Sequence, residues 1–424
     1  MAINKEDMLI FVDSNNNNNK YYHMILQDNG NINIDYGRIG GGKQTTTKSG
    51  GEREYNKLLN SKLKKGYERS SIALNNQEIK TSKHSLLELA MSQIQHSNQT
   101  VKDLIQRLVD KNIHNITTST NISFNKDNNL FMTPIGPVTE DGINQAKELL
   151  NKLFKFMEKN EWNDMYSDSV FIKLNEDYFK LIPTKIANLR NKRDYMLLTP
   201  SRISSQMDIC DTLKQTLDLL KDKPDIQKEK EVEQVFQVQI NLLEDKKIFK
   251  QILNKFNESK NKDHGGKVNS LTIENIYELE VGNEKNDLKS HLGNVWELWH
   301  GTRVVNILSI LKSGLLMPKE APGQKTGAMF GNGLYFSDQS TKSLNYCDGM
   351  YWNSNAKQDR VYMFLAEVVM GNYQIPKCSK SKAPEAGYHS YYAKAGESGV
   401  RNNEMIVFDT KQIRLKYLLE LKGC

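Results

Sequence analysis

Hydrophobic residues change their spacing twice along the chain, and these changes divide it into three parts. Over residues 20–78 the apolar positions alternate, with Ile32, Ile34 and Tyr36 following a turn signal at residues 28–31. A period of two predicts strands, and a short helix is expected near residues 54–63. Residues 1–19 end in the asparagine run Asn15–Asn19, so we expect this segment to be disordered and of low complexity.

From residue 82 to residue 222 the spacing becomes helical. Apolar residues recur at intervals of three and four in three stripes: Leu86, Leu87, Ala90 and Ile94; Val101, Leu104, Ile105 and Leu108; and Met207, Cys210, Leu213 and Leu217. Such stripes are the packing faces of amphipathic helices, so an all-α bundle is expected here. The charged stretch 221–231 contains Pro224 and is expected to be a linker.

Residues 223–424 return to strand-like spacing, now mixed with helices. Val238, Ile240 and Leu242 alternate, residues 361–370 are almost continuously apolar, and strict alternation resumes from Ile413 to Leu421. Hairpin-like turns outnumber long crossovers, which favours mainly antiparallel sheets. The fold class predicted for the whole chain is therefore α+β and multidomain, with a β-rich module, a helical bundle and an α+β domain.

Composition and charge narrow the possible partners. The 424 residues carry a net charge of +7, which permits an anionic partner without identifying one. The four cysteines show neither metal-ligand spacing nor a disulfide pattern, so we expect no metal site and a reducing compartment. No apolar run is long enough to cross a bilayer, and no membrane partner is expected.

The residues that carry chemistry gather in the last third of the chain. A Trp-His-Gly-Thr sequence at residues 299–302 precedes a predicted helix that ends at Gly314, and Met-Phe-Gly-Asn-Gly-Leu-Tyr-Phe follows at residues 329–336. Ser337-Asp338 is expected to cap a second helix carrying Lys-Ser-Leu-Asn-Tyr-Cys at residues 342–347. Glu404 opens a predicted strand. Singly these are a turn, half-buried aromatics and a strand-end carboxylate; their order together points to function.

In that order the segments resemble the NAD-binding core of the poly(ADP-ribose) polymerase family. Glu320-Ala321-Pro322 and His389-Ser390 extend the match. The resemblance implies a catalytic set of Glu404, His300, Tyr335 and Lys342. It implies NAD contacts from His300, Gly301, Ser343, Tyr335 and Tyr346, with Met329 lining the site of the acceptor.

The chemistry of that reaction fits these residue types. Nicotinamide leaves NAD+ without needing a proton, and the ribose carbon becomes oxocarbenium-like, as in glycoside hydrolysis. A carboxylate beside the ribose stabilises that charge, and rigid binding of nicotinamide orients the reaction. NAD+ is then a substrate, and no prosthetic cofactor is expected.

The first two parts extend the resemblance. Tyr-Gly-Arg-Ile-Gly at residues 36–40 resembles the signature of the WGR module, with Tyr36 where the family has tryptophan. Eleven basic and six acidic residues give residues 20–80 a charge of +5, as phosphate binding requires. Tyr36, Arg38 and Lys43 are the DNA-binding candidates. Residues 131–136 and 178–183 resemble landmarks of the family's helical regulatory domain, placed here at 82–222.

The resemblance predicts a nuclear ADP-ribosyltransferase activated by DNA strand breaks. It would form poly(ADP-ribose) on itself and on other protein acceptors. Because the segment between Ser390 and Glu404 is short, mono-ADP-ribosylation is an alternative. A second alternative is a non-enzymatic scaffold for DNA ends, against which the retention of His300, Tyr335 and Glu404 argues.

Overall fold

The computed structural model describes most of the chain and divides it into two compact units. The residues described are 3–13, 18–39, 42–70, 86–96, 98–120, 122–125, 130–133, 136–159, 165–183, 196–220, 236–317, 329–348, 350, 359–377 and 383–422. One unit comprises residues 1–85 and 113–225, and the other comprises residues 86–112 and 226–424. Each is described by itself.

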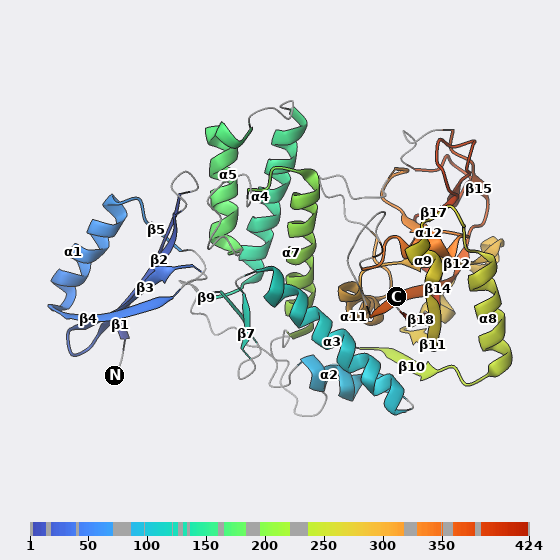
Figure 1. The fold of residues 1–424 in the computed structure, drawn as a ribbon, viewed down its shortest axis with the longest axis horizontal. Coiled ribbons are helices and arrows are strands. Elements are labelled where there is room, and N and C mark those ends of the chain that lie inside the picture. Colours follow the sequence, from blue (N-terminus) through green and yellow to red (C-terminus); the bar gives the residue numbers. More distant parts are fainter. Residues whose placement is uncertain are drawn as a thin grey trace. The chain divides into compact units, whose positions relative to one another are not determined.

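The first unit begins with an antiparallel sheet and one helix (Figure 1). The elements are β1 (Ile3–Asp13), β2 (Asn18–Gln27), β3 (Asn31–Arg38), β4 (Lys43–Ser49), α1 (Gly51–Lys64) and β5 (Glu68–Arg69), and the strand order is β4-β3-β2-β1-β5. Ile32 and Ile34 are fully buried against Tyr55 and Leu59 of α1. The alternation in the sequence and the short helix are confirmed.

The prediction that residues 1–19 are disordered is wrong for residues 3–13, 18 and 19; the remaining positions lie outside the described residues. Strand β1 occupies residues 3–13, and Met8, Leu9 and Ile10 are buried in the sheet. Strand β2 begins inside the asparagine run, where Asn19 pairs with Val12. Asparagine composition disfavours a strand only locally, whereas the apolar run before it buries surface on both faces of the sheet.

The remainder of the first unit is mainly helical. It contains the end of α3 (Gln99–Ser119), then α4 (Glu140–Lys159), η1 (Met165–Ser167), α5 (Ser169–Leu181) and α7 (Pro200–Leu220). The stripe on α7 is buried as expected, with Cys210 and Leu213 fully covered. Thr139 caps α4 by accepting a hydrogen bond from the backbone N–H of Gly142 at 3.1 Å, which holds the start of that helix.

An all-α bundle over residues 82–222 is nevertheless not what the structure shows. Strands β7 (Ser123–Asn125), β8 (Leu130–Thr133) and β9 (Gly136–Pro137) form a three-stranded sheet between α3 and α4. The rings of Phe124 and Phe131 pack with centroids 5.0 Å apart. Aromatic and β-branched residues next to a proline favour extended backbone, and this local preference prevails there.

Residues 86–112 fold with the second unit, whereas the sequence placed them in a helical domain of residues 82–222. Helix α2 (Leu86–Gln93) leads into β6 (Gln95–His96), which pairs in parallel with β10 (Val238–Leu242). The side-chain oxygen of Gln93 accepts a hydrogen bond from the backbone N–H of Phe236 at 3.0 Å. The first part of α3 is therefore a component of the C-terminal domain.

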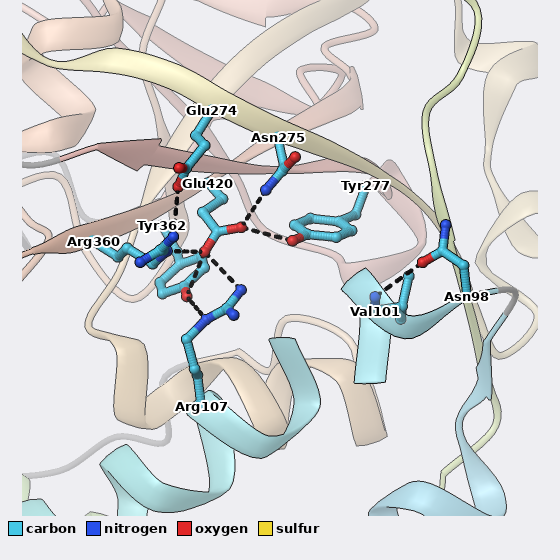
Figure 2. A network of polar contacts seen from close by, with 9 residues as sticks. All are labelled: Asn98, Val101, Arg107, Glu274, Asn275, Tyr277, Arg360, Tyr362 and Glu420. Carbon is cyan, nitrogen blue, oxygen red and sulfur yellow. Dashed lines mark hydrogen bonds and ion pairs between the residues drawn. The ribbon is translucent and has the colours of Figure 1, made fainter. Parts of the chain in front are cut away.

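A buried carboxylate joins α3 to that domain (Figure 2). Glu420 has no exposed surface, and its Oε1 lies 2.8 Å from Arg107 of α3 and 2.7 Å from Arg360. Its Oε2 accepts hydrogen bonds from Tyr277 at 2.6 Å and Asn275 at 2.9 Å. A charge without solvent requires such partners, and no spacing in the sequence shows that Arg107 supplies one.

The second unit contains two sheets. The larger sheet has the order β12-β14-β18-β11-β10-β6, with β11 (Thr272–Val281), β12 (Val295–Gly301), β14 (Arg360–Val369) and β18 (Ile413–Lys422). The smaller sheet has the order β13-β17-β16-β15, with β13 (Leu334–Phe336), β15 (Tyr373–Gln374), β16 (Ser390–Ala393) and β17 (Glu404–Val407). Pairings are antiparallel except β10–β6 and β15–β16. Mainly antiparallel sheets are confirmed.

Helices lie between the strands of these sheets along the chain. They are α8 (Lys246–Glu258), α9 (Gly266–Ser270), α10 (Glu284–Asp287), η2 (Ser290–Leu292), α11 (Val304–Ser313), α12 (Ser340–Leu344) and η3 (Thr410–Gln412). Helix α11 ends as predicted at Gly314, whose φ of 68° is a conformation that glycine adopts readily. Trp299 and Phe256 are fully buried in the core beneath α8 and α12.

Candidate active site

Strands β12 and β13 place His300. Two backbone hydrogen bonds, of 2.9 and 3.0 Å, join Trp299 to Ser337. His300 then lies with Nδ1 3.0 Å from the carbonyl oxygen of Tyr335. Because a carbonyl only accepts, Nδ1 carries the proton and Nε2 is left as an acceptor. Burial lowers the pKa of His300, which keeps the ring neutral and Nε2 able to accept a hydroxyl proton.

The ion pair of Lys342 and Glu404 is almost completely buried. Lys342 Nζ lies 2.7 Å from Glu404 Oε1, with side-chain exposures of 8% and 10%. The same ammonium donates to the carbonyl oxygen of Asn403 at 3.0 Å. Burial lowers the pKa of Lys342, and the charge of Glu404 acts in the opposite direction. Glu404 Oε2 is buried and has no hydrogen-bond partner in the part of the chain that the structure describes.

Tyr335 lies on the face of the small sheet that carries Glu404. It pairs with Ile406 across β13 and β17, and Ile406 is two residues from Glu404 on the same strand. Residues opposite each other and two apart share a face. The Tyr335 hydroxyl donates to the carbonyl oxygen of Gly331 at 2.9 Å. Burial raises the Tyr335 pKa, and the neighbouring Glu404 and Tyr346 raise it further.

Gly301 and Ser343 lie against each other. A Cβ on Gly301 would come 1.7 Å from the carbonyl oxygen of Ser343, so only glycine fits at this end of β12. The Ser343 hydroxyl donates to the carbonyl oxygen of Trp299 at 3.0 Å. Both contacts hold α12 against β12. They supply a structural reason for these two residues beside the binding role that the sequence predicted.

The predicted start of α12 is wrong by two residues. The helix begins at Ser340 and its N-cap is Gln339. Ser337 instead accepts a hydrogen bond from the backbone N–H of Gln339 at 3.0 Å, because Ser337 is held by its bridge to Trp299. The helix ends at Leu344, so Tyr346 lies in the turn after it and is half-buried.

These contacts bring seven predicted residues into one region, namely His300, Gly301, Tyr335, Lys342, Ser343, Tyr346 and Glu404. Met329 lies at the start of the turn that precedes β13, and it is 45% exposed. Residues 320–322 lie outside the described residues.

Asn403 is a residue of the site that the sequence did not single out. Its side chain donates to Asp338 Oδ2 at 2.7 Å and accepts from the backbone N–H of Ala395 at 2.9 Å. These bonds fix the turn that delivers Glu404 and its bond to Lys342. In a chain rich in asparagine, no local pattern distinguishes this one.

The candidate DNA-binding residues lie on the β3–β4 hairpin of the first unit. The Tyr36 ring packs on Tyr22 at 5.9 Å, Arg38 stands opposite Lys20, and Lys43 pairs with Asp35 at 2.8 Å. The Lys43–Asp35 pair is solvent-exposed and therefore weak. Gly37 lies between Tyr36 and Arg38. A Cβ at this position would come 2.5 Å from the carbonyl oxygen of Gly42, so glycine is required there.

A second basic group on this module was not predicted. Lys62 lies over the Tyr22 ring at 3.9 Å and over the Tyr67 ring at 5.0 Å. Burial lowers the pKa of Lys62, and the charges of Lys65, Lys20 and Lys48 lower it further. Lys62 thus lies over two aromatic rings and has three other cations near it, an arrangement suited to a polyanion with exposed bases or sugars.

No three of the described His, Cys, Asp and Glu side chains cluster as metal ligands would. Among the helices that the structure describes, none combines the length and apolar character needed to cross a bilayer.

The chain thus combines a β-rich module at its start with a mixed α/β domain that holds the buried Lys342–Glu404 pair. The family model "Poly(ADP-ribose) polymerase catalytic domain" matches residues 246–399, and the "WGR domain" model matches residues 6–73. The chain therefore carries a poly(ADP-ribose) polymerase catalytic domain and a WGR domain. The WGR match includes residues 6–13 of β1, while Glu404 lies just beyond the catalytic match.

Curated relatives agree with this assignment. The chain is 33% identical over 199 residues to Poly [ADP-ribose] polymerase 1 of Caenorhabditis elegans, covering 38% of this chain and 20% of that protein. It is 32% identical over 186 residues to Poly [ADP-ribose] polymerase 2 of Homo sapiens, covering 36% and 31%. It is 26% identical over 329 residues to the Oryza sativa polymerase 1, covering 69% and 32%. The chain thus spans a third or less of the length of these relatives.

Proposed function

We propose that this chain transfers ADP-ribose from NAD+ to protein acceptors, itself included, and that DNA strand breaks activate it. The proposal rests on the Lys342–Glu404 pair, in which one carboxylate oxygen is bonded and the other, buried oxygen has no partner among the described residues. An unpaired buried oxygen is costly unless a ligand completes it. A ribose hydroxyl of NAD+ is the ligand that the family assignment supplies.

In this proposal the side chains of the site divide the steps of the reaction among them. Glu404 holds the nicotinamide ribose, stabilises the oxocarbenium-like carbon and orients the acceptor hydroxyl. Lys342 holds the carboxylate of Glu404 in place. His300 accepts a hydrogen bond from the adenosine ribose at Nε2, consistent with its protonated Nδ1. Tyr335 and Tyr346 enclose the nicotinamide ring, and Met329 lines the acceptor side.

Activation by DNA is proposed for the WGR domain. Tyr36, Arg38 and Lys43 on one hairpin and the cations around Lys62 offer charge and aromatic surface for a broken strand. The helices of residues 113–220 would relay occupancy of that module to the NAD site by a shift in population between states. Such an enzyme would act on nuclear acceptors, so we place it in the nucleus.

The test is incubation of the full chain with labelled NAD+, with and without nicked, 5′-phosphorylated DNA. A ladder or smear of automodified protein that requires DNA is the expected result. A single discrete shift would mean mono-ADP-ribosylation. DNA binding without any consumption of NAD+ would mean a non-enzymatic scaffold and would contradict the proposal.

A further inference from the structure

A buried histidine outside the predicted set bridges the two segments that carry the Lys342–Glu404 pair. His264 lies in the loop between α8 and α9 and is 5% exposed. Its Nδ1 is 2.8 Å from Thr341 Oγ1, and its Nε2 is 3.0 Å from Asn402 Oδ1. Thr341 immediately precedes Lys342, and Asn402 lies two residues before Glu404.

Each hydrogen bond of this bridge has a definite donor and a definite acceptor. The backbone N–H of Asn261 donates to Thr341 Oγ1 at 2.9 Å. The Asn402 oxygen only accepts, and it also accepts from Asn261 Nδ2 at 3.4 Å, so His264 Nε2 carries a proton and donates it to Asn402. In neutral His264 the other ring nitrogen, Nδ1, is then an acceptor, and the Thr341 hydroxyl donates to it. The neutral Nε2–H form of His264 satisfies every member of the chain.

The bridge acts at two places where the backbone has little support of its own. Helix α12 has only five residues and therefore few internal hydrogen bonds, and Glu404 is the first residue of β17, directly after residues that belong to no strand. A transferase gains from holding its charged groups in place before the substrate arrives. Thr341 and Asn402 give α12 and the turn before β17 a common point of attachment.

We propose that His264 is a positioning residue for the transfer reaction: by tying Thr341 to Asn402, it fixes Lys342 and Glu404 relative to the NAD+ ribose. The inference rests on the function proposed above. It assigns to His264 no contact with NAD+ and no proton transfer to substrate. His264 affects the rate by fixing the position of Glu404, because a displacement of about 1 Å in a catalytic group can lower the rate on the order of 100-fold.

The experiment compares kcat and KM for NAD+ in the full chain with DNA present. In His264→Ala we expect kcat to fall about 10- to 100-fold while KM changes by less than about threefold, since the loss concerns the transition state and not binding. Thr341→Val, which removes only the hydroxyl, should lower kcat in the same direction. His264→Gln keeps an N–H for Asn402 and should recover part of the rate. Exposed His291, changed to alanine, is the matched control.

Two further measurements separate positioning from folding. The combined His264→Ala/Thr341→Val variant should be no slower than the slower single variant, because both break one bridge. Stabilisation by a benzamide that mimics nicotinamide should be retained. A His264→Ala protein with a lower melting temperature but a wild-type kcat would reduce His264 to a structural residue and overturn the inference alone. A wild type that consumes no NAD+ would instead remove the proposed function, and this inference with it.

Discussion

At the scale of single residues, the site depends on which polar atoms are already satisfied. Lys342 bonds one oxygen of Glu404 and leaves the other without a partner in the described part of the chain. His300 uses Nδ1 on a backbone carbonyl, and Ser343 uses its hydroxyl on another. The atoms left over are the ones that a substrate can bind.

Glu404→Gln should reduce ADP-ribose transfer by at least about 100-fold and leave NAD+ binding nearly intact. The amide has the size of the carboxylate and can still accept from Lys342, but it does not offset cationic character or activate an acceptor hydroxyl. Initial rates with labelled NAD+ and thermal shifts with benzamide check this. Glu258→Gln, an exposed carboxylate at the end of α8, is the control. Wild-type rates in Glu404→Gln would exclude this residue from catalysis.

A substitution of Gly301 tests NAD+ binding less directly than the sequence suggests. A side chain there would overlap the carbonyl oxygen of Ser343, so loss of NAD+ binding in Gly301→Val would follow from displacement of α12 as well as from a blocked carboxamide site.

Glu284 makes stability depend on pH. Burial raises its pKa to about 7, opposed by a hydrogen bond from the backbone N–H of Leu415 and by the charge of Arg414. The folded state then holds a proton that the unfolded chain releases above about pH 4.3, so this residue's contribution to stability falls as the pH rises from about 4.3 to 7. Glu284→Gln should therefore stabilise the protein at pH 7.5 by about 2 kcal/mol and have little effect at pH 4.5.

Thermal unfolding at several pH values measures this difference. Glu280→Gln, on an exposed position of β11, should leave the pH dependence unchanged. An equal shift in melting temperature for Glu284→Gln at both ends of the pH range would contradict the assignment.

At the scale of secondary-structure elements, α3 is held to the catalytic domain by a buried charge. Hydrogen bonds from Tyr277 and Asn275 and the charges of Arg107 and Arg360 outweigh burial, which acts to raise the pKa, and hold the pKa of Glu420 below its usual value. A lowered carboxyl pKa contributes stability above the unfolded value that is lost as the pH falls through the folded one. The anchor of α3 should therefore weaken in acid.

Arg107→Ala should destabilise the second unit by about 2 kcal/mol, because Glu420 keeps only Arg360 as a cation and Tyr362 loses a donor. The measurement is the thermal transition of the full chain together with hydrogen exchange in residues 86–112. Lys102→Ala, exposed on the same helix, should change neither. If exchange in α2 and α3 stays as slow as in the wild type, Arg107 is not the anchor.

At the scale of the whole molecule, the proposed function requires that one domain senses DNA and another transfers ADP-ribose. Tyr36→Ala combined with Arg38→Ala should abolish stimulation by nicked DNA and leave the basal rate of NAD+ consumption unchanged. The two side chains lie on β3, in the unit that does not contain Glu404. DNA affinity of the wild type should also fall steeply with salt, since phosphate contacts release counterions.

The control for this variant is Lys57→Ala, whose side chain is 76% exposed on α1. It should keep both stimulation and the slope of affinity against salt. Normal stimulation of the double variant, or binding that does not respond to salt, would rule out the β3–β4 hairpin as the DNA-sensing surface.

Much of the fold follows from local patterns. Alternation identified β3, β10 and β18, helical stripes identified α3 and α7, and Gly314 marked the end of α11. These predictions succeed because side-chain direction repeats every two residues in a strand and every 3.6 in a helix, whatever the rest of the chain does. Motif order likewise identified His300, Tyr335, Lys342 and Glu404 as one site.

Other features depend on contacts between residues far apart in the sequence. Strand β1 is stable because β2 pairs with it, and α2 with the first part of α3 belongs to the catalytic domain because Glu420 requires Arg107. His264 became part of the site only when folding placed it between Thr341 and Asn402. The sequence by itself determined many of the elements and the candidate chemistry that they carry. Tertiary structure alone decided which polar groups satisfy one another, because burial makes that choice and no local pattern records it.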